Sequence, residues 1–194
     1  WTSAGLTGSV VSGIAVSGTE IYAATFGQAV QRSSDGGASW TLANAGLVNP
    51  IVTSVLPVGN TLYAGTFGDG VFRSVNRGNS WTRTGPGGQI VAWSLAASET
   101  AVYCGTAGDG VFRSTDGGNR WSPVNSGLTS RSISSLEVVG AAVYAGTFAT
   151  NAQEDAGVFR LSDGGASWTP VNAGLTDPDF PRLEAMGTTL YVGT

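Results

Sequence analysis

The chain has 194 residues, a length that suits one domain with a sizeable core, and its net charge is −4 at pH 7. This charge and a pI near 4.6 argue against nucleic-acid binding, which needs clustered basic residues. No apolar run approaches the roughly 20 residues of a membrane span. Every basic residue is an arginine, there is no histidine, and Cys104 is the single cysteine. We therefore expect no internal disulfide, no histidine- or cysteine-based metal site and no cofactor.

Tryptophans recur along the chain about every 40 residues, a spacing that is typical of stacked or radial arrays. They predict a single domain of repeats with the ranges 1–39, 40–80, 81–120, 121–167 and a partial 168–194. Each repeat holds four short strand-like runs separated by Gly, Asn or Asp turns, which we name A, B, C and D. In the second repeat these runs are 51–59, 61–67, 70–74 and 80–84.

In chain order the pattern starts with a D run at Trp1, continues through four complete A–B–C–D passages, and ends with an A and a B run before Thr194. Two arrangements agree with this count. In the first, a five-bladed ring closes when the N-terminal D run completes the last blade. In the second, the chain is part of a larger ring or of one closed by another copy, since an open array exposes strand edges.

An octet of the form Ser-x-Asp-x-Gly-x-x-Trp recurs at the turn between runs C and D. We expect its Asp and Ser to accept backbone N–H groups of their own turn, its Gly to supply a positive φ, and its Trp to pack between strands. The motif is therefore predicted to be structural. Its members are Ser33, Asp35, Gly37 and Trp40; Asn76, Gly78 and Trp81; Ser114, Asp116, Gly118 and Trp121; and Asp163, Gly165 and Trp168.

On these octets the chain resembles the Asp-box, or bacterial neuraminidase repeat, propellers, a group that includes sialidase-, sortilin- and photosystem-assembly-factor-like proteins. Two octets are intact, Asn76 replaces the Asp of another, and Leu161 replaces the Ser of the last. The resemblance implies an all-β fold, a β-propeller of about five four-stranded antiparallel blades. It also implies glycan or protein ligands.

Residues that occupy the same position in each repeat are interpreted as structural framework. All five tyrosines share one position in run B, and four arginines share one position in run C: Arg32, Arg73, Arg113 and Arg160. Cys104 stands where other repeats have Ala and is expected to be a small buried side chain.

The remaining residues are candidates for ligand binding. Trp93 lies in run A, which lines the channel of a propeller, at a position where other repeats have Ser, Thr or Pro. An insertion at 150–156 brings Glu154 and Asp155 to the B–C connection of the fourth repeat. The B–C and D–A connections should emerge on one face, opposite the octets. That face is predicted to carry Phe26, Phe67, Phe148, Asp69, Asp109, Arg131 and Arg182, with Asp177 and Asp179 close by.

These candidates favour a noncatalytic recognition module of an exported bacterial-type protein, which binds glycan or protein through this loop face. A structural or assembly component of a cell-surface complex is the alternative. A fragment of a propeller glycoside hydrolase is the second alternative, although the tyrosines and most arginines are framework and the Phe-Arg-Ile-Pro signature of sialidases is absent. The expected location is extracellular or cell-surface, with the periplasm as a variant.

Overall fold

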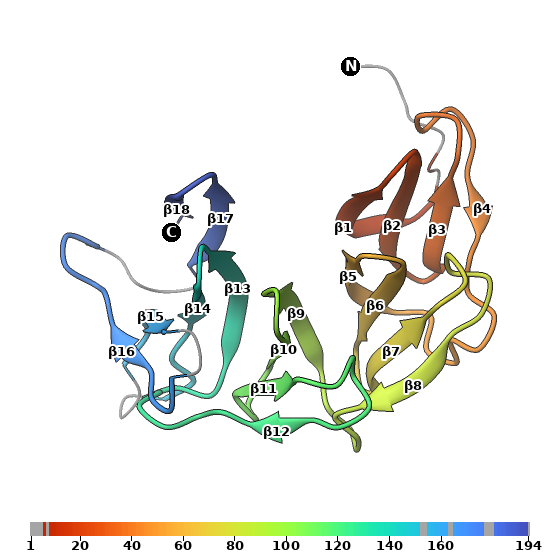
Figure 1. Ribbon diagram of the computed structural model, residues 1–194. Coiled ribbons are helices and arrows are strands. Elements are labelled where there is room, and N and C mark those ends of the chain that lie inside the picture. Colours follow the sequence, from red (N-terminus) through yellow and green to blue (C-terminus); the bar gives the residue numbers. More distant parts are fainter. Residues whose placement is uncertain (1–5, 7, 152–154, 163–164, 177–180, 194) are drawn as a thin grey trace. The chain divides into compact units, whose positions relative to one another are not determined.

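The computed structural model describes residues 6, 8–151, 155–162, 165–176 and 181–193 (Figure 1). The chain divides into two compact units, Trp1–Ala92 and Trp93–Thr194. We describe each unit by itself. The predicted Asp163, Glu154, Asp177 and Asp179 lie outside the described residues.

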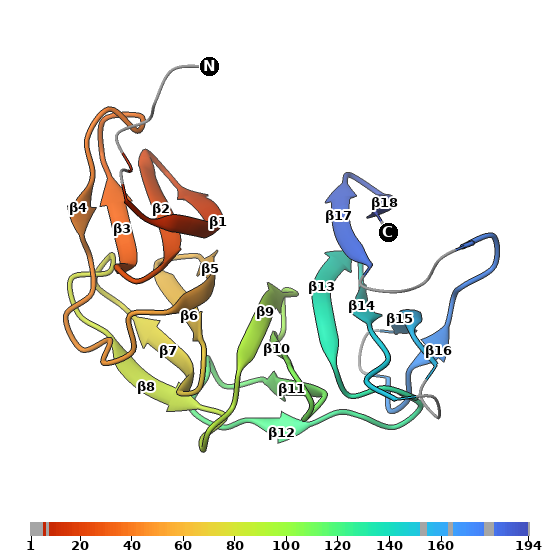
Figure 2. The same cartoon turned by 180° about the vertical axis from the view of Figure 1, so that it is seen from behind.

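The first unit contains two four-stranded antiparallel sheets, each with its strands in chain order (Figures 1 and 2). The strands are short segments rich in Val, Ile, Tyr and Thr, which favour extended backbone. Each strand ends where a turn rich in Gly and Asn begins. They are β1 (Val10–Ser17), β2 (Glu20–Phe26), β3 (Ala29–Ser33) and β4 (Thr41–Leu42), followed by β5 (Val52–Val58), β6 (Thr61–Thr66), β7 (Gly70–Ser74) and β8 (Thr82–Gly85).

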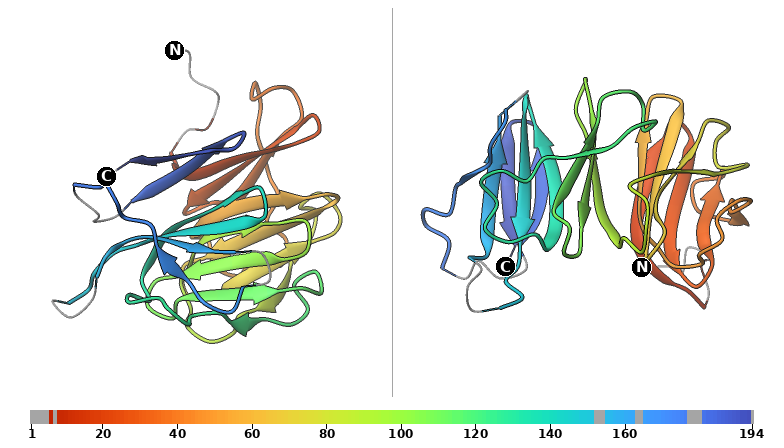
Figure 3. Two further views of the ribbon diagram at one scale, coloured as in Figure 1. Left: turned by 60° about the vertical axis from the view of Figure 1, so that its left-hand side comes forward. Right: turned by 90° about the horizontal axis from the view of Figure 1, so that it is seen from below.

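The second unit contains two further four-stranded sheets and one two-stranded sheet among its described residues (Figure 3). Strand β17 packs beside β13, joined by hydrogen bonds from Ser134 and Ser135 to the Pro181 carbonyl of 2.7 and 2.9 Å. The strands are β9 (Ala92–Ala97), β10 (Val102–Thr106), β11 (Val111–Ser114) and β12 (Ser122–Pro123), then β13 (Ile133–Val139), β14 (Ala142–Thr147), β15 (Gly157–Leu161) and β16 (Thr169–Pro170), and finally β17 (Arg182–Met186) and β18 (Thr189–Gly193).

The expected fold class is confirmed. Each four-stranded antiparallel sheet is one A–B–C–D passage of the repeat, as in the blades of a β-propeller, and the set fits a propeller of roughly five blades. The described residues contain no helix, so none of them forms a helix that could cross a membrane.

Strand A of a blade carries a hydroxyl that reaches the next blade. A register irregularity leaves Ser12 in β1, Thr53 in β5 and Ser134 in β13 as extra residues opposite their B strands. Ser12 donates to the Val52 carbonyl at 2.6 Å, and Thr53 donates to the carbonyl of Ala92, the last residue of its unit. At each bulge the extra residue therefore directs its hydroxyl towards the next A strand and forms a hydrogen bond with it.

The recurring octets form hairpins tied to their own main chain. In the first, the Asp35 carboxylate accepts the Ser39 backbone N–H at 2.9 Å and the Ser39 hydroxyl at 2.5 Å. The Ser33 hydroxyl accepts the Gly37 N–H at 2.8 Å and donates to Asp35. In the second, Asn76 takes the place of the carboxylate and accepts the Ser80 N–H at 2.9 Å. The third repeats this pattern around Asp116.

The octet tryptophans fall into two kinds. The indole N–H groups of Trp40 and Trp121 donate to a carbonyl of their own hairpin, that of Gly37 and Gly118. The indole N–H groups of Trp81 and Trp168 instead donate to carbonyls of the preceding blade, at 2.7 Å from Ala43 and 2.6 Å from Val124. Trp81 and Trp168 are also the more deeply buried, at 4% and 2% exposed.

The contacts of Trp81 and Trp168 are made with an Asn-Ala/Ser-Gly-Leu turn in the preceding blade, which we name the latch turn. It occurs at 44–47 and 125–128, and its second residue accepts the backbone N–H of the following tryptophan, Trp81 or Trp168, at 2.8 Å. Its glycine, Gly46 or Gly127, lies so close to that tryptophan that an added Cβ would be 2.2 Å from the tryptophan carbonyl oxygen. The blade before Trp121 has Pro-Gly-Gly-Gln at 86–89 in place of this turn.

Each unit has its own hydrophobic core between its blades. In the first, Trp81 belongs to one buried cluster with Tyr22, Val55 and Phe72, and in the second Trp168 belongs to one with Tyr103, Leu136 and Phe159. Cys104 is fully buried, and this burial raises the pKa of its thiol. The latched tryptophan is therefore the member of each core that joins two sheets.

We predict that Gly46→Ala destabilises the protein by about 2 kcal/mol more than Gly174→Ala. Both glycines have nearly the same backbone angle, with φ of +90° and +89°, so the backbone strain of an alanine is matched. The added Cβ meets the Trp81 backbone only at Gly46, whereas nothing lies within 4 Å of it at Gly174. Urea denaturation measures both variants, and equal losses would contradict the latch.

We also predict a pH-dependent cost for Asp35→Asn. Hydrogen bonds from the Ser39 side chain and backbone, and from Ser33, lower the pKa of the Asp35 carboxyl from 3.8 to about 2. Because this pKa is lower in the folded state, the stabilisation is present above pH 4 and is lost as the pH falls towards 2. The difference in unfolding free energy between wild type and Asp35→Asn should therefore shrink over this range. A difference independent of pH would argue against the carboxylate as its source.

Candidate functional site

The B–C and D–A connections meet at one end of the strands. Single backbone bridges pair Phe26 with Ile51 and Phe67 with Val91 in the first unit, and Ala107 with Ser132 in the second. Each bridge joins the end of strand B to the residue before strand A of the next blade. The side chains of Phe26 and Phe67 are 39% and 48% exposed, so this end of the first unit presents two aromatic rings on fixed backbone.

The acidic candidates of the loop face occupy tight turns. Asp109 is exposed, its N–H donates to the Thr106 hydroxyl at 3.1 Å, and its carbonyl accepts from Asn125 at 3.0 Å. Asp69 is half-buried in the equivalent turn of the first unit. The two aspartates belong to different units.

The remaining candidates lie in the second unit. Arg131 is exposed, and its carbonyl accepts the Gly108 and Gly110 N–H groups. Arg182 donates from its guanidinium to the Ser134 carbonyl at 3.2 Å, which commits part of this group to holding β17 beside β13. Phe148 is half-buried, and its carbonyl accepts the Ser130 hydroxyl. Trp93 is half-buried in β9, where it replaces the hydroxyl residue of other blades.

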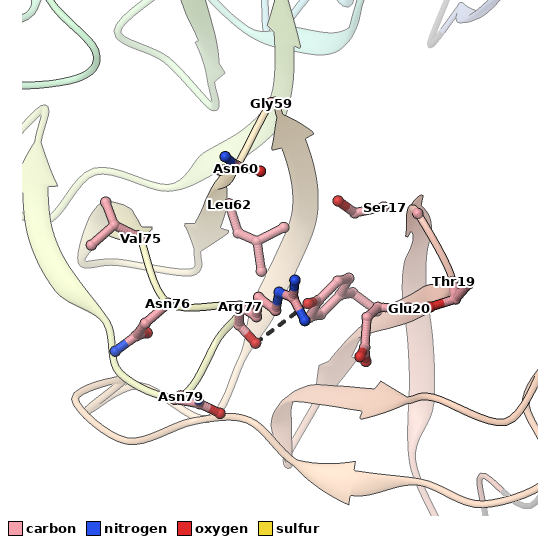
Figure 4. A pocket seen from close by; sticks show the side chains of 12 residues that line it. Ser17, Thr19, Glu20, Gly59, Asn60, Leu62, Val75, Asn76, Arg77 and Asn79 are labelled. Atoms are coloured by element: carbon pink, nitrogen blue, oxygen red, sulfur yellow. Dashed lines mark hydrogen bonds between the residues drawn. The ribbon is translucent and has the colours of Figure 1, made fainter.

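A pocket of about 900 Å³ lies at the opposite end of the first unit, between its two sheets (Figure 4). Ser17 and Thr19 of the β1–β2 turn line one side, and Asn76 and Asn79 of the hairpin between β7 and β8 line the other. Arg77 projects into the space between them. The other lining residues are Gly18, Glu20, Tyr22, Gly59, Asn60, Leu62 and Val75.

The backbone of Arg77 is held in a left-handed conformation, with φ of +59°. Its carbonyl accepts two hydrogen bonds from the first blade, from the Tyr22 hydroxyl at 3.3 Å and from Arg32 Nη1 at 3.2 Å. Arg32 Nη1 also donates to the Asn79 side chain at 3.2 Å. The framework arginine and tyrosine of one blade thus fix the hairpin of the next and aim Arg77 into the pocket.

Glu20 supplies the negative charge of this pocket. Its Oε2 is buried, accepts no hydrogen bond, and lies 3.6 Å from Arg32 Nε. Burial raises the pKa of Tyr22, and the Glu20 charge raises it further against the lowering effect of Arg32 and Arg77. The ion pair with Arg32 offsets part of the cost of burying Glu20 Oε2.

Sequence reasoning missed this pocket, although the repeat carried a signal. Arg77 stands where the other described octets have Gly36 and Gly117, both with positive φ. Glu20 stands where the next B strand has Thr61 and the following one Ala101. When one repeat has a charged residue at a position where the other repeats have a small one, that repeat departs from the common framework there.

A second pocket of about 420 Å³ lies on the loop end of the second unit. The described part of the 150–156 insertion reaches it through Asp155 and Ala156, and the Thr129 hydroxyl donates to the Asp155 carbonyl at 2.9 Å. Gly127, Phe159, Pro170 and Asn172 complete its lining.

Each pocket has one carboxylate among the lining residues that the structure describes, Glu20 in the larger and Asp155 in the smaller. Glycoside hydrolysis needs two carboxyl groups about 5–9.5 Å apart across the scissile bond. Within the described ranges no three His, Cys, Asp or Glu side chains gather as a metal site would require.

Residues 10–192 match the family described as the DUF6242 beta propeller domain, and the chain belongs to this family. No curated protein matches the chain.

Solved structures share the fold. The extracellular domain of the putative one component system BT4673 from B. thetaiotaomicron is 17% identical, with a TM-score of 0.74 over 95% of this chain and 26% of that one. The GH74 xyloglucanase from Xanthomonas campestris is 17% identical, with a TM-score of 0.68 over 92% of this chain and 36% of that one. YCF48 from Cyanidioschyzon merolae is 18% identical, with a TM-score of 0.59 over 84% and 56%. The chain thus spans between a quarter and about half of these structures.

We predict that Arg77→Gly stabilises the protein by about 1 kcal/mol, because a left-handed backbone costs a non-glycine residue about that much. The two hydrogen bonds to the residue-77 carbonyl use backbone and survive the change. The matched control is Gly36→Ala, at the same octet position with φ of +73° and nothing within 4 Å of an added Cβ, which should lose a similar amount. Thermal denaturation measures both, and a destabilised Arg77→Gly would contradict the strain.

Proposed function

We propose that this propeller domain is a noncatalytic recognition module and that the pocket around Glu20 and Arg77 binds a neutral sugar unit of a glycan. The observation that carries the proposal is a polar pocket of about 900 Å³ whose lining combines the Glu20 carboxylate with Arg77, Asn60 and Asn79. The hydroxyls of a sugar unit can donate to and accept from groups of these kinds.

The balance of charges in the pocket favours a neutral, hydroxyl-rich ligand. The Glu20 carboxylate offers acceptors and the Arg77 guanidinium offers donors, while Asn60 and Asn79 provide both kinds of group. Leu62 and Val75 add an apolar surface against which C–H groups can pack. A strongly anionic ligand would be repelled by Glu20, and a strongly cationic one by Arg77.

A protein ligand bound through the loop face is the second candidate. It is favoured by the exposed pair Phe26 and Phe67, because two aromatic rings on rigid backbone are common anchors of protein interfaces.

We also propose that the domain acts outside the cell or at its surface and has no glycosidase activity of its own. An extracellular location is supported by the similarity to the extracellular domain of BT4673. The similarity to GH74 enzymes leaves hydrolysis as the alternative, and it would need a second carboxylate beside the one that each pocket has among its described lining residues.

The test is binding of the purified chain to an array of neutral and acidic glycans, followed by calorimetry on the glycans that bind. Glu20→Gln removes the charge that accepts the sugar hydroxyl and should weaken binding about tenfold, a loss of about 1.4 kcal/mol. Arg77→Gly should weaken it similarly while the fold gains stability. Arg120→Gly, which removes an exposed arginine from another hairpin, is the matched control and should leave binding unchanged.

An empty array, or binding that all three variants keep, would rule out the sugar pocket. Release of reducing sugar from a polysaccharide panel by the same preparation would overturn the noncatalytic assignment.

The protein candidate is tested with Phe26→Ala and Phe67→Ala. If the loop face is the interface, each variant should weaken capture of a partner from extracellular material by at least tenfold, because buried aromatic anchors contribute about 2 kcal/mol or more. Leu42→Ala, at a side chain that is 61% exposed on β4, is the control. Equal capture by all three would exclude the loop face as the interface.

A further inference from the structure

The hairpin between β7 and β8 departs from the other octets at three consecutive positions, Val75, Asn76 and Arg77. In the other repeats these positions hold a hydroxyl residue, an aspartate and a glycine; they are Ser34, Thr115 and Ser162, then Asp35, Asp116 and Asp163, then Gly36, Gly117 and Gly164. All three departing residues line the pocket of about 900 Å³ in the first unit. The changes are therefore concentrated on one wall of one pocket.

The exchange of aspartate for Asn76 leaves the hairpin intact. Asn76 Oδ1 accepts the Ser80 N–H and the Ser74 hydroxyl, both at 2.9 Å, and its Nδ2 is 2.8 Å from the Ser80 hydroxyl, to which it donates. Asp35 makes the corresponding contacts in the first octet. The exchange therefore has one further effect, which is to remove a negative charge from this wall of the pocket. A ligand oxygen that accepts hydrogen bonds is not repelled there.

Two side chains of the same hairpin offer hydrogen-bond donors. Arg32 Nη1 donates to Asn79 Oδ1 at 3.2 Å, so the NH₂ group is the end of the Asn79 amide that remains for a ligand. The Arg77 side chain projects into the pocket (Figure 4), and its guanidinium donates no hydrogen bond to any residue that the structure describes. This wall is therefore suited to an acceptor such as a carbonyl oxygen.

Val75 adds an apolar surface to the wall that carries these donors. Its side chain is 70% exposed, at a position where the other repeats have hydroxyl residues. Leu62 is a second apolar residue of the lining. A ligand methyl group that covers Val75 removes this surface from water, which favours binding.

The β1–β2 side of the pocket has the opposite hydrogen-bonding chemistry. Glu20, the first residue of β2, lies on this side (Figure 4), and its carboxylate accepts hydrogen bonds but donates none. The ion pair with Arg32, at 3.6 Å, holds it there. This side is therefore suited to a ligand N–H or O–H group.

We propose that the sugar unit in this pocket is an N-acetylhexosamine, an inference that rests on the proposed function. A secondary amide in the trans form points its carbonyl oxygen and its N–H in opposite directions. The acetamido oxygen accepts from Arg77 and Asn79, and the acetamido N–H donates to Glu20. The methyl group is bonded to the carbonyl carbon, so it lies on the same side as the oxygen and covers Val75.

Other sugars match these groups less well. A plain hexose has hydroxyls for both sides of the pocket but no methyl group for Val75. The carboxylate of a hexuronate satisfies the donors of Arg77 and Asn79, but the Glu20 charge repels it. An O-acetylated sugar has the carbonyl and the methyl group but lacks the N–H that donates to Glu20.

The first test compares matched sugars by saturation-transfer NMR and by competition. N-acetylglucosamine is paired with glucose and N-acetylgalactosamine with galactose, and glucuronate serves as the anionic sugar. At least one N-acetylhexosamine should bind about tenfold more tightly than its parent hexose, and its acetamido methyl protons should receive the strongest saturation. Glucuronate should bind more weakly than that N-acetylhexosamine.

The second test removes the features on which this preference depends. Val75→Ser restores the kind of residue that the other octets have, and Asn79→Asp keeps the acceptor for Arg32 but removes the donor. Each variant should reduce the preference for the N-acetylhexosamine over its hexose at least threefold. The melting temperature of each variant shows whether it folds as the wild type does.

Matched controls place the same changes away from the pocket. Val48→Ser replaces another valine of the first unit, one that is 79% exposed. Gln28→Glu adds a negative charge at the loop end and keeps the acceptor of the hydrogen bond from Gln31 Nε2, as Asn79→Asp does for Arg32. Both controls should keep the full preference.

Equal binding of N-acetylhexosamines and hexoses would overturn this inference and leave the sugar pocket standing. A preference that Val75→Ser and Asn79→Asp both keep would do the same. If glucuronate binds most tightly, the ligand is an acidic sugar and the inference is wrong. Absence of binding by every sugar would overturn the inference together with the proposed function.

Discussion

The contact between a latch turn and the tryptophan of the next blade is the interaction on which each unit depends. Propeller blades are separate sheets, and single backbone bridges such as Phe26–Ile51 join neighbouring blades at one end, so most of the contact between them depends on turns and side chains. In the first unit the two blades are joined by the turn at 44–47 and the residue before it, which accept the backbone N–H and the indole N–H of Trp81. The glycine is what allows the two backbones to approach so closely. The tryptophan ring then fills the space between the sheets.

The same framework creates the candidate site. Arg32 and Tyr22 hold the neighbouring hairpin by its Arg77 carbonyl, and this contact leaves the Arg77 side chain free to project away from the core. The pocket therefore lies where two blades are joined, which is a region of the fold with fixed backbone. Glu20 adds a carboxylate that is ion-paired with Arg32 beside this pocket. Glu20 and Arg77 thus line the contact between two blades at positions where the neighbouring described repeats have smaller residues.

Much of the fold could be predicted from the sequence because each repeat is defined by interactions between residues that are close in the sequence. The octet hairpins close on themselves through neighbours four residues apart, such as Asp35 and Ser39, and the tyrosines of strand B recur at fixed spacing. The site was predicted less well. Phe26 and Phe67 are exposed, as expected from their position in the repeat, and their role in binding stays a prediction, whereas the pocket of Glu20 and Arg77 was not predicted. Its residues are far apart in sequence and belong to the end of the blades that was interpreted as purely structural.

The sequence by itself determined the class of fold, the strand order and the hairpin turns, since each depends on a local pattern of hydrophobic residues, glycines and short polar side chains. Only the tertiary structure decided that Trp81 and Trp168 are latched and that Glu20 is paired with Arg32 beside a pocket. These features depend on the approach of two blades about 40 residues apart in the chain, and no local pattern specifies such a distance. The physical reason is that backbone pairing stabilises each blade internally, whereas side-chain packing between two sheets determines how one blade contacts the next.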